Sequence, residues 1–273
     1  MVKEIVKMTV MFLATVLILS IGSGSISNHD STQYVITEFE LYDSLPDQAD
    51  NEESPENPNP DLCDPEYRII RFGHYEQDGN ENNGLEEIEW LVLETDPQEN
   101  KALIISLYGL DAIVFDPADY CTWEDSSIRG WLNESFFLRA FTEEEQQRII
   151  PASVSVSTYY PASDSNMAKG ELPEPTEDRV FLLTYDEAKQ YFPTASLRRC
   201  KPTEMTTQVI ESTWLLTHVR EDGYFDWNTR TIYEGNDRVI TINERGNFHT
   251  SVFWSRNQIR PVIWVDYAIT SVE

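Results

Sequence analysis

The sequence is poor in basic residues. Of 273 residues only 20 are lysine or arginine, against 48 aspartates and glutamates, so the formal net charge is −28 at pH 7. A surface with this charge repels the phosphates of nucleic acids and of anionic membranes. This shortage argues against nucleic acid as a partner, and against membrane contact other than through the N-terminal segment. Cationic partners and a divalent ion stay compatible with this charge. The simpler interpretation is that the charge only keeps the protein soluble.

Cysteine is scarce as well, and there are three: Cys63, Cys121 and Cys200. An odd number allows one disulfide plus a free thiol, and the spacing does not choose the pair. No Cys-x-x-Cys motif is present, which argues against a zinc site or a thioredoxin-like redox site. The histidines are scattered and do not accompany a cysteine, so we expect structural cysteines instead of a catalytic Cys–His pair.

The chain also lacks an apolar run of the roughly 20 residues that a membrane-spanning helix needs. The predominantly apolar run near the N-terminus, Met8 to Ile21, holds 14 residues, follows Lys3 and Lys7, and precedes small residues. This pattern predicts that residues 1–25 are a secretory signal peptide. An uncleaved anchor is the alternative, because Lys7 can extend to the membrane surface and lengthen the span. In both cases we expect an extracytoplasmic protein, secreted or anchored to the membrane.

Lysine and arginine are absent altogether from Asn28 to Tyr67, where 12 acidic residues and five prolines occur. Such a composition buries too little apolar surface to offset the chain entropy lost on folding. We therefore predict an acidic, proline-containing, disordered linker over residues 26–65. The globular domain should occupy residues 66–273, a length that can bury a substantial core.

Helical signals concentrate between residues 122 and 150. Thr122 with Asp125 resembles a capping box and predicts a helix start near Trp123 or Glu124, and Asn133 is a plausible stop. Thr142 with Glu145 is a second capping box, and Pro151 should end that helix. Two tryptophans and three phenylalanines in so short a span predict that this helical block is the packing centre of the domain.

Strand patterns flank the helical block on both sides. A third capping box, Thr184 with Glu187, predicts a helix to Phe192, whereas the pattern of residues 198–211 is unclear. Strands before helices and strands after them indicate an α+β fold in a single compact domain of short antiparallel strands. The predicted strands cover residues 68–75, 88–95, 102–107, 153–159, 180–183, 213–217, 224–233, 239–242, 248–254 and 260–266, with a turn at 243–247.

Several motifs in this order resemble a bacterial family known as domain of unknown function 6273. They are Arg71-Phe72-Gly73, Ile88 to Leu93, Lys101 to Ser106, Thr122-Trp123-Glu124, Ser127 to Asn133, Val180 to Leu183, Trp214-Leu215 and Arg260 to Val265. The chain has Leu216 where members usually have Arg, and Gln258 where they usually have Gly. More weakly, the C-terminal hairpin and the Arg260-Pro261 strand resemble formylglycine-generating enzymes and C-type lectins. The resemblance implies a compact α+β domain in a cell-surface setting, and it implies no activity.

Aromatic and polar residues alternate near the C-terminus and form the candidate ligand surface. Flat rings beside carboxylate and guanidinium groups suit stacking on a sugar or a peptide. Period-two spacing also points half of the rings toward the core, which is the competing interpretation. The candidate ligand-binding residues are Tyr224, Asp226, Trp227, Arg230 and Trp254.

One loop resembles a calcium site. Asp78, Asn80, Asn82 and Glu89 occupy positions 1, 3, 5 and 12 of an EF-hand-type loop. Position 6 is Asn83 instead of glycine, and the flanking segments are predicted strands instead of helices. A solvated hairpin loop is therefore the main interpretation. Calcium is the alternative, and it is the only cofactor that the sequence raises.

These observations predict a surface binding module that recognises a cell-wall or host glycan, or a protein. An enzyme, an oxidase or hydrolase on a scaffold like that of formylglycine-generating enzymes, is one alternative, and a purely structural surface domain is another. No nucleophile–base pair or catalytic metal cluster stands out in the sequence, so no catalytic residue is predicted.

Overall fold

The computed structural model describes residues 68–118, 120–156, 158–159, 174–212, 222–233 and 237–266. All of them belong to one compact unit, which confirms the predicted single-domain α+β fold. The predicted signal or anchor segment (1–25), the predicted linker (26–65) and the predicted strand at 213–217 lie outside the described residues. Within the described part, no helix is long and apolar enough to cross a membrane.

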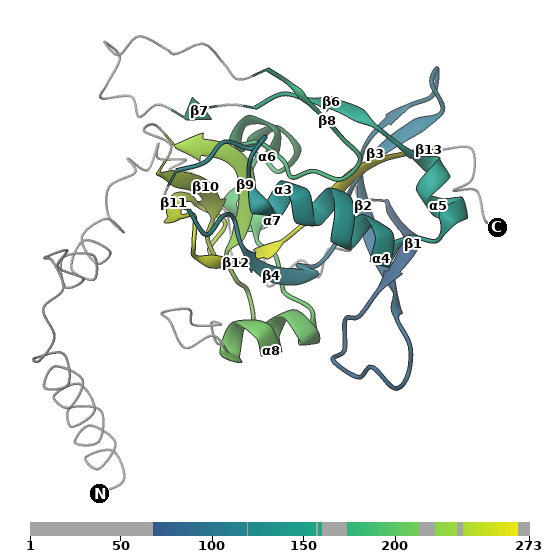
Figure 1. Ribbon diagram of the computed structural model, residues 1–273, viewed down its shortest axis with the longest axis horizontal. Coiled ribbons are helices and arrows are strands. Elements are labelled where there is room, and N and C mark those ends of the chain that lie inside the picture. Colours follow the sequence, from purple (N-terminus) through teal and green to yellow (C-terminus); the bar gives the residue numbers. More distant parts are fainter. Residues whose placement is uncertain are drawn as a thin grey trace, which may run out of the picture. The chain divides into compact units, whose positions relative to one another are not determined.

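A five-stranded antiparallel sheet forms one half of the domain (Figure 1). Its strand order is β1 (Ile69–Tyr75), β2 (Glu86–Asp96), β3 (Lys101–Ser106), β13 (Val262–Asp266) and β5 (Ile149–Ile150). The predicted strands in these regions are confirmed to within two residues at either end. β3 lies in the middle, and its residues from Ala102 to Ser106 are all buried, as expected for an apolar strand between two neighbours.

A six-stranded sheet forms the other half. Along it run β11 (Phe248–Val252), β10 (Arg238–Ile242), β9 (Trp227–Tyr233), β12 (Arg256–Ile259) and β4 (Asp111–Val114), and β7 (Thr158–Tyr159) pairs with β9. The predicted turn between β10 and β11 is confirmed, with Gly246 at φ 84°. The sequence pattern did not predict β4 or β12 as strands, because both are short and β12 is polar. Their hydrogen bonds come from strands distant in sequence.

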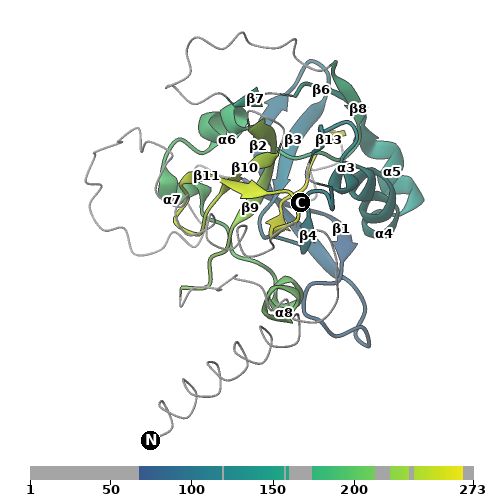
Figure 2. The ribbon, with the colours of Figure 1, turned by 60° about the vertical axis from the view of Figure 1, so that its left-hand side comes forward.

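A two-stranded sheet, β6 (Ala152–Val154) with β8 (Thr176–Asp178), lies next to the helical block. The block itself contains α3 (Ser127–Trp131), the π-helical turn η2 (Leu132–Phe136), α4 (Phe137–Ala140) and α5 (Glu143–Arg148). Figure 2 shows these helices on one side of β1 to β3, and β9 to β11 on the other side.

Two expectations for the start and stop of the first helix are wrong. The helix begins at Ser127, with Ser126 accepting a hydrogen bond from the Arg129 amide, and Thr122 with Asp125 forms a separate turn before it. Asn133 does not stop the helix. Its side chain bridges to the segment after β8, so a residue that favours caps and turns is held inside the helical block by tertiary hydrogen bonds. The capping boxes at Thr142 and Thr184 are confirmed.

The helical block lies against the five-stranded sheet through aromatic rings. Phe141 contacts the rings of Phe72 and Trp90 at centroid distances of 5.4 and 6.3 Å. Phe136 lies edge-on to Phe141 at 5.9 Å and also contacts Tyr75. All five side chains are buried, which supports the prediction that the block is a packing centre.

Three further helices follow the two-stranded sheet: α6 (Tyr185–Tyr191), α7 (Ala195–Arg198) and α8 (Glu204–Ser212). In residues 198–211, whose sequence pattern was unclear, α8 occupies the part from residue 204 onward. In both views α8 lies beside the loop between β1 and β2 (Figures 1 and 2). The Met205 amide donates to the Gln77 carbonyl oxygen over 2.8 Å, which joins α8 to that loop.

Candidate functional site

Trp227, the central residue of the predicted ligand surface, lies in the core. It is completely buried on β9, and its indole nitrogen donates to the Arg198 carbonyl oxygen over 2.8 Å. The guanidinium of Arg260 lies 5.0 Å from the centre of its ring. A ligand therefore has no access to this ring in the folded protein.

Arg230 is also buried, and its guanidinium is fully used by the protein. It forms two parallel hydrogen bonds to Glu187 on α6, of 2.7 and 2.8 Å. It donates as well to the carbonyl oxygens of Ser155 and Leu182. This fork fixes α6 onto β9, so Arg230 holds the fold together at this point.

Tyr224 and Asp226 lie just before β9 and face protein groups. Tyr224 is 9 % exposed and stacks under the Arg199 guanidinium, 3.6 Å from the ring centre. One oxygen of Asp226 accepts from the Glu244 amide over 2.9 Å, and the other lies 3.0 Å from Nε2 of His249. A carboxylate beside a histidine is one component of acid–base chemistry.

The two cysteines in the described part of the chain, Cys121 and Cys200, supply no nucleophile for that pair. Cys200 is 1 % exposed, and its thiol points at the Leu107 carbonyl oxygen. Burial raises its pKa, while Arg260 acts in the opposite direction. Burial together with Asp116 and Asp125 raises the pKa of Cys121 to about 12. Both thiols are free and protonated at neutral pH, and Cys63 lies outside the described residues.

Trp254 is the one member of the predicted group whose ring is open to solvent, with 45 % of the residue exposed. It lies in the turn before β12. Tyr120, 72 % exposed, lies in the loop after β4. The two loops meet at the same end of the β4–β12 ribbon, because Arg256 pairs with Val114 and the Asp116 amide donates to the Phe253 carbonyl oxygen. We call Trp254 and Tyr120 the aromatic edge.

The predicted calcium loop brings together a different set of carboxylates. One oxygen each from Glu76, Asp78 and Glu86 lies within 4.8 Å of the others. Glu89 points away and pairs with Arg71 over 3.2 Å. Hydrogen bonds from the Asn83 side chain and the Asn80 amide lower the pKa of Asp78. The backbone and side-chain nitrogens of Asn82 donate to Oδ1 of Asn80, so these two predicted ligands contact each other. Calcium binding in this loop stays a prediction.

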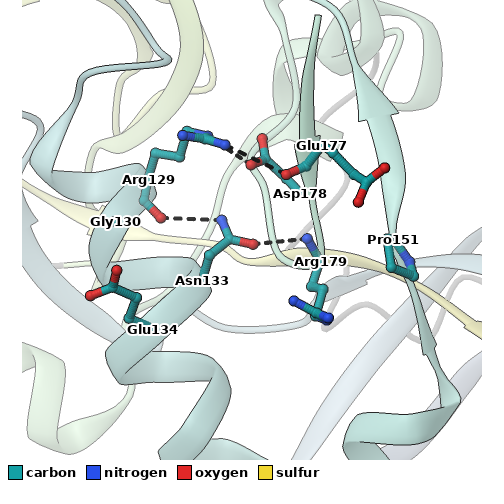
Figure 3. A pocket seen from close by; sticks show the side chains of 8 residues that line it. All are labelled: Arg129, Gly130, Asn133, Glu134, Pro151, Glu177, Asp178 and Arg179. Atoms are coloured by element: carbon teal, nitrogen blue, oxygen red, sulfur yellow. Dashed lines mark hydrogen bonds and ion pairs between the residues drawn. The ribbon is translucent and has the colours of Figure 1, made fainter.

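A polar cavity of about 200 Å³ opens between the helical block and the two-stranded sheet (Figure 3). We call it the polar pocket. Its helical wall carries Arg129, Gly130, Asn133 and Glu134, and its strand wall carries Pro151, Glu177, Asp178 and Arg179.

The floor of the polar pocket is a closed hydrogen-bond network. Asp178, 1 % exposed, accepts from Arg129 Nε over 2.7 Å and from the Trp123 indole over 2.9 Å. Asn133 uses both ends of its amide, since its nitrogen donates to the Val180 carbonyl oxygen and its oxygen accepts from the Arg179 amide, each over 2.8 Å. These bonds fix the walls relative to each other and leave the floor satisfied and rigid.

Sequence reasoning missed the polar pocket for an identifiable reason. In the sequence Arg129 belongs to a family motif, Asn133 belongs to the same motif and resembles a helix stop, and Glu177 to Arg179 follow a loop-like stretch. The pocket exists because η2 continues the helix past Asn133 and β8 lies against it. The one local signal was the pair Arg129 and Asn133, four residues apart on one helical face.

The architecture therefore defines a compact α+β domain with a polar pocket at its π-helical turn and an aromatic edge at the end of a short ribbon. The chain matches the family described as Domain of unknown function (DUF6273) over residues 99–267, and it belongs to that family. Gln258 donates from its buried amide to the carbonyl oxygens of Cys200 and Phe225.

No curated protein and no solved structure matches the chain. The weaker resemblance to formylglycine-generating enzymes and C-type lectins therefore stays a prediction.

Proposed function

We propose that the protein is an extracytoplasmic recognition module that binds a glycan at the aromatic edge. The observation that carries this proposal is the exposure of Trp254 and Tyr120 at the same end of the β4–β12 ribbon. Exposed flat rings on adjacent loops suit stacking against the apolar face of a sugar. The exposed Arg256 beside Trp254 adds a hydrogen-bond donor.

The setting outside the cytoplasm is part of the same proposal. Its support is the sequence pattern of residues 1–25, and the net charge of −28 suits a solvated surface protein. N-terminal sequencing of the protein recovered from its native cell fraction is expected to give either a start near residue 26 or an intact anchor. Recovery of the intact chain from the cytosol would contradict this part.

The binding test is a screen of the full chain against glycans and peptidoglycan fragments, repeated on three variants. Trp254→Ala and Tyr120→Ala should each weaken binding by about fivefold, because stacking contributes about 1 kcal/mol beyond buried area. Tyr108→Ala is the matched control, since Tyr108 is exposed but precedes β4, at the opposite end of that strand. Trp227→Ala is unsuitable, because it would damage the core.

Two results would overturn glycan recognition at this edge. One is the absence of binding to any glycan, which would leave the enzyme and structural alternatives. The other is binding that Trp254→Ala and Tyr120→Ala leave unchanged, which would locate the ligand elsewhere on the domain.

A further inference from the structure

The outer strands of the two large sheets are protected in different ways. An outer strand presents unpaired backbone N–H and C=O groups, which proteins shield with short strands, bulges, charges or a covering helix. In the five-stranded sheet, β5 has two residues, and β1 has a bulge between Arg71 and His74. The Gly73 amide on β1 also donates to the Glu145 carboxylate over 3.2 Å. In the six-stranded sheet, β4 has four residues, and α8 lies against it.

The fourth outer strand, β11, is regular and uncharged. It lies at the end of the six-stranded sheet, next to β10 (Figure 1). Its five residues, Phe248–Val252, include no lysine, arginine, aspartate, glutamate or proline. Its pairing with β10 continues without a bulge from one end of the strand to the other. β11 therefore lacks the bulge and the charges that would prevent another strand from pairing with it.

The turn between β10 and β11 shows which backbone groups of β11 point outward. The Asn243 amide donates to the Asn247 carbonyl oxygen over 2.8 Å, so these two residues form a bonded pair. Bonded and non-bonded pairs alternate along an antiparallel ladder, so His249, two residues after Asn247, also bonds to β10. Phe248 and Thr250 therefore direct their N–H and C=O groups away from β10.

A contact on the other side of β10 supports this orientation. The Thr229 hydroxyl on β9 donates to the Ile240 carbonyl oxygen over 2.6 Å, and Ile240 is the partner of Thr250. Because that carbonyl points toward β9, the pair is a non-bonded one and Thr250 faces outward. Within the described part of the chain, no hydrogen bond reaches the backbone groups of Phe248 or Thr250 outside the ladder with β10. Both residues are partly exposed.

The two faces of β11 carry different side chains, because successive residues of a strand point to opposite faces. On the Phe248 face, the ring of Tyr185 lies 4.3 Å from the ring of Phe248. On the His249 face, Oδ2 of Asp226 lies 3.0 Å from Nε2 of His249, and 16 % of the Asp226 side chain is exposed. One face beside the open edge is therefore aromatic, and the other carries a carboxylate in a chain with net charge −28.

We propose that β11 accepts an extended segment of a partner protein as a further strand of the six-stranded sheet. The backbone groups of Phe248 and Thr250 supply the hydrogen bonds, and the side chains of the two faces set the preference for sequence. The partner's residues are apolar on the Phe248 face and are lysine or arginine on the Asp226 face. A second copy of this chain fits less well, because two chains with net charge −28 repel each other. This docking edge is separate from the aromatic edge and does not depend on glycan binding.

The test uses three capped peptides as long as β11: Val-Lys-Val-Lys-Val, the same peptide with every backbone amide N-methylated, and Val-Glu-Val-Glu-Val. Each is added to the full chain, and hydrogen exchange of the β11 amides is followed by NMR. At about ten times its Kd, the lysine peptide should slow exchange at Phe248 and Thr250 by about tenfold, because exchange then requires the peptide-free form. The other two peptides should have no effect. The His249 amide, which bonds to β10, should exchange slowly throughout.

Four variants sharpen the test. Thr250→Pro removes an outward N–H and keeps the ladder with β10, so it should remove detectable binding of the lysine peptide while His249 still exchanges slowly. Thr250→Val keeps that N–H and should bind as the unaltered chain does. Asp226→Asn should weaken the binding by about two- to fivefold, the range for a partly exposed ion pair. Tyr120→Ala, at the aromatic edge, should leave it unchanged.

Four results would overturn the proposal. Exchange at Phe248 and Thr250 that is as slow as at His249 without peptide would show that the edge is already covered. Equal binding of the N-methylated peptide would exclude strand addition. Equal or tighter binding of the glutamate peptide would show that the partner is not basic. Self-association of the chain that Thr250→Pro abolishes would identify a second copy as the occupant.

Discussion

The two halves of the domain bury different chemistry. The apolar half, which is the five-stranded sheet with α3, η2, α4 and α5, is held by ring contacts among Phe72, Trp90, Phe136 and Phe141. The polar half is the six-stranded sheet with α6 and α7. Among the described residues, one buried polar side chain, Ser106, lies on the five-stranded sheet, whereas eight lie on the six-stranded sheet. They are Asn228, Thr229, Arg230, Thr231, Thr241, Ser251, Asn257 and Gln258.

This difference changes how each half responds to substitution. In the apolar half the decrease in the free energy of unfolding should grow with the side-chain volume removed, because dispersion and apolar burial are shared among many contacts. In the polar half the decrease in the free energy of unfolding should depend on whether the substitution leaves a buried polar group without a hydrogen-bond partner. Asn228 is one member of such a network: its side-chain oxygen accepts from Asn257 over 2.9 Å, and its Nδ2 has no hydrogen-bond partner among the described residues.

The largest effect is expected for Trp90→Ala in the apolar half. Trp90 is fully buried on β2, contacts Phe141 and donates to the Phe72 carbonyl oxygen over 2.7 Å. Its removal should lower the free energy of unfolding by about 4 kcal/mol, measured by urea denaturation. Trp254→Ala is the control and should stay within about 0.5 kcal/mol. Equal losses would contradict the assignment of Trp254 to the surface.

Glu187→Ala should have the next largest effect, about 3 kcal/mol, because it leaves the buried Arg230 without its counter-charge. Asp186→Ala, the exposed neighbour on the same helical turn, should cost far less. The double variant Arg230→Met with Glu187→Ala should recover part of the loss, because an apolar pair leaves no unpaired charge. A double variant no more stable than Glu187→Ala would show that packing, not charge, controls this position.

Glycine substitutions should give a smaller effect. Gly246 has φ 84°, and a Cβ there would lie 1.7 Å from the Ala195 carbonyl oxygen, so Gly246→Ala must move the β10–β11 turn away from α7. We expect a loss of about 2 kcal/mol. Gly84→Ala is the matched control, because φ is also positive but no atom lies within 4 Å. If both variants lose the same stability, backbone strain alone determines the cost.

The smallest predicted effect is a dependence on pH at Asp116, which joins the two halves. Burial alone would raise the pKa of this carboxyl. The hydrogen bonds from the Ala118 amide and from the hydroxyl and amide of Ser127 outweigh burial, so its pKa lies below the usual value. The stabilisation is therefore present above about pH 4 and is lost as the pH falls through the lowered pKa.

Asp116→Asn should flatten that loss of stability below about pH 4, measured by thermal unfolding across the pH range. Asp125→Asn is the control, because Asp125 is exposed in the neighbouring turn. An unchanged pH profile in Asp116→Asn would show that other carboxyls cause the acid sensitivity.

The sequence by itself determined the elements whose signals are local. Residues within a few positions of one another are enough to predict the capping boxes at Thr142 and Thr184, the apolar strands β1, β2, β3 and β13, and the turn that contains Gly246. Hydrogen bonds of a cap and alternation along a strand need no distant partner. The α+β class and the family motifs could be predicted for the same reason.

Tertiary structure decided the rest. Only packing showed that Trp227 and Arg230 face the interior while Trp254 faces solvent, since period-two spacing leaves the choice of face open. Only the contact between η2 and β8 brings Asn133 to Arg179, residues 46 positions apart, and so creates the polar pocket. Short strands such as β12 and sites built from distant elements depend on partners that local pattern does not specify, because their hydrogen bonds and charges are supplied from elsewhere in the chain.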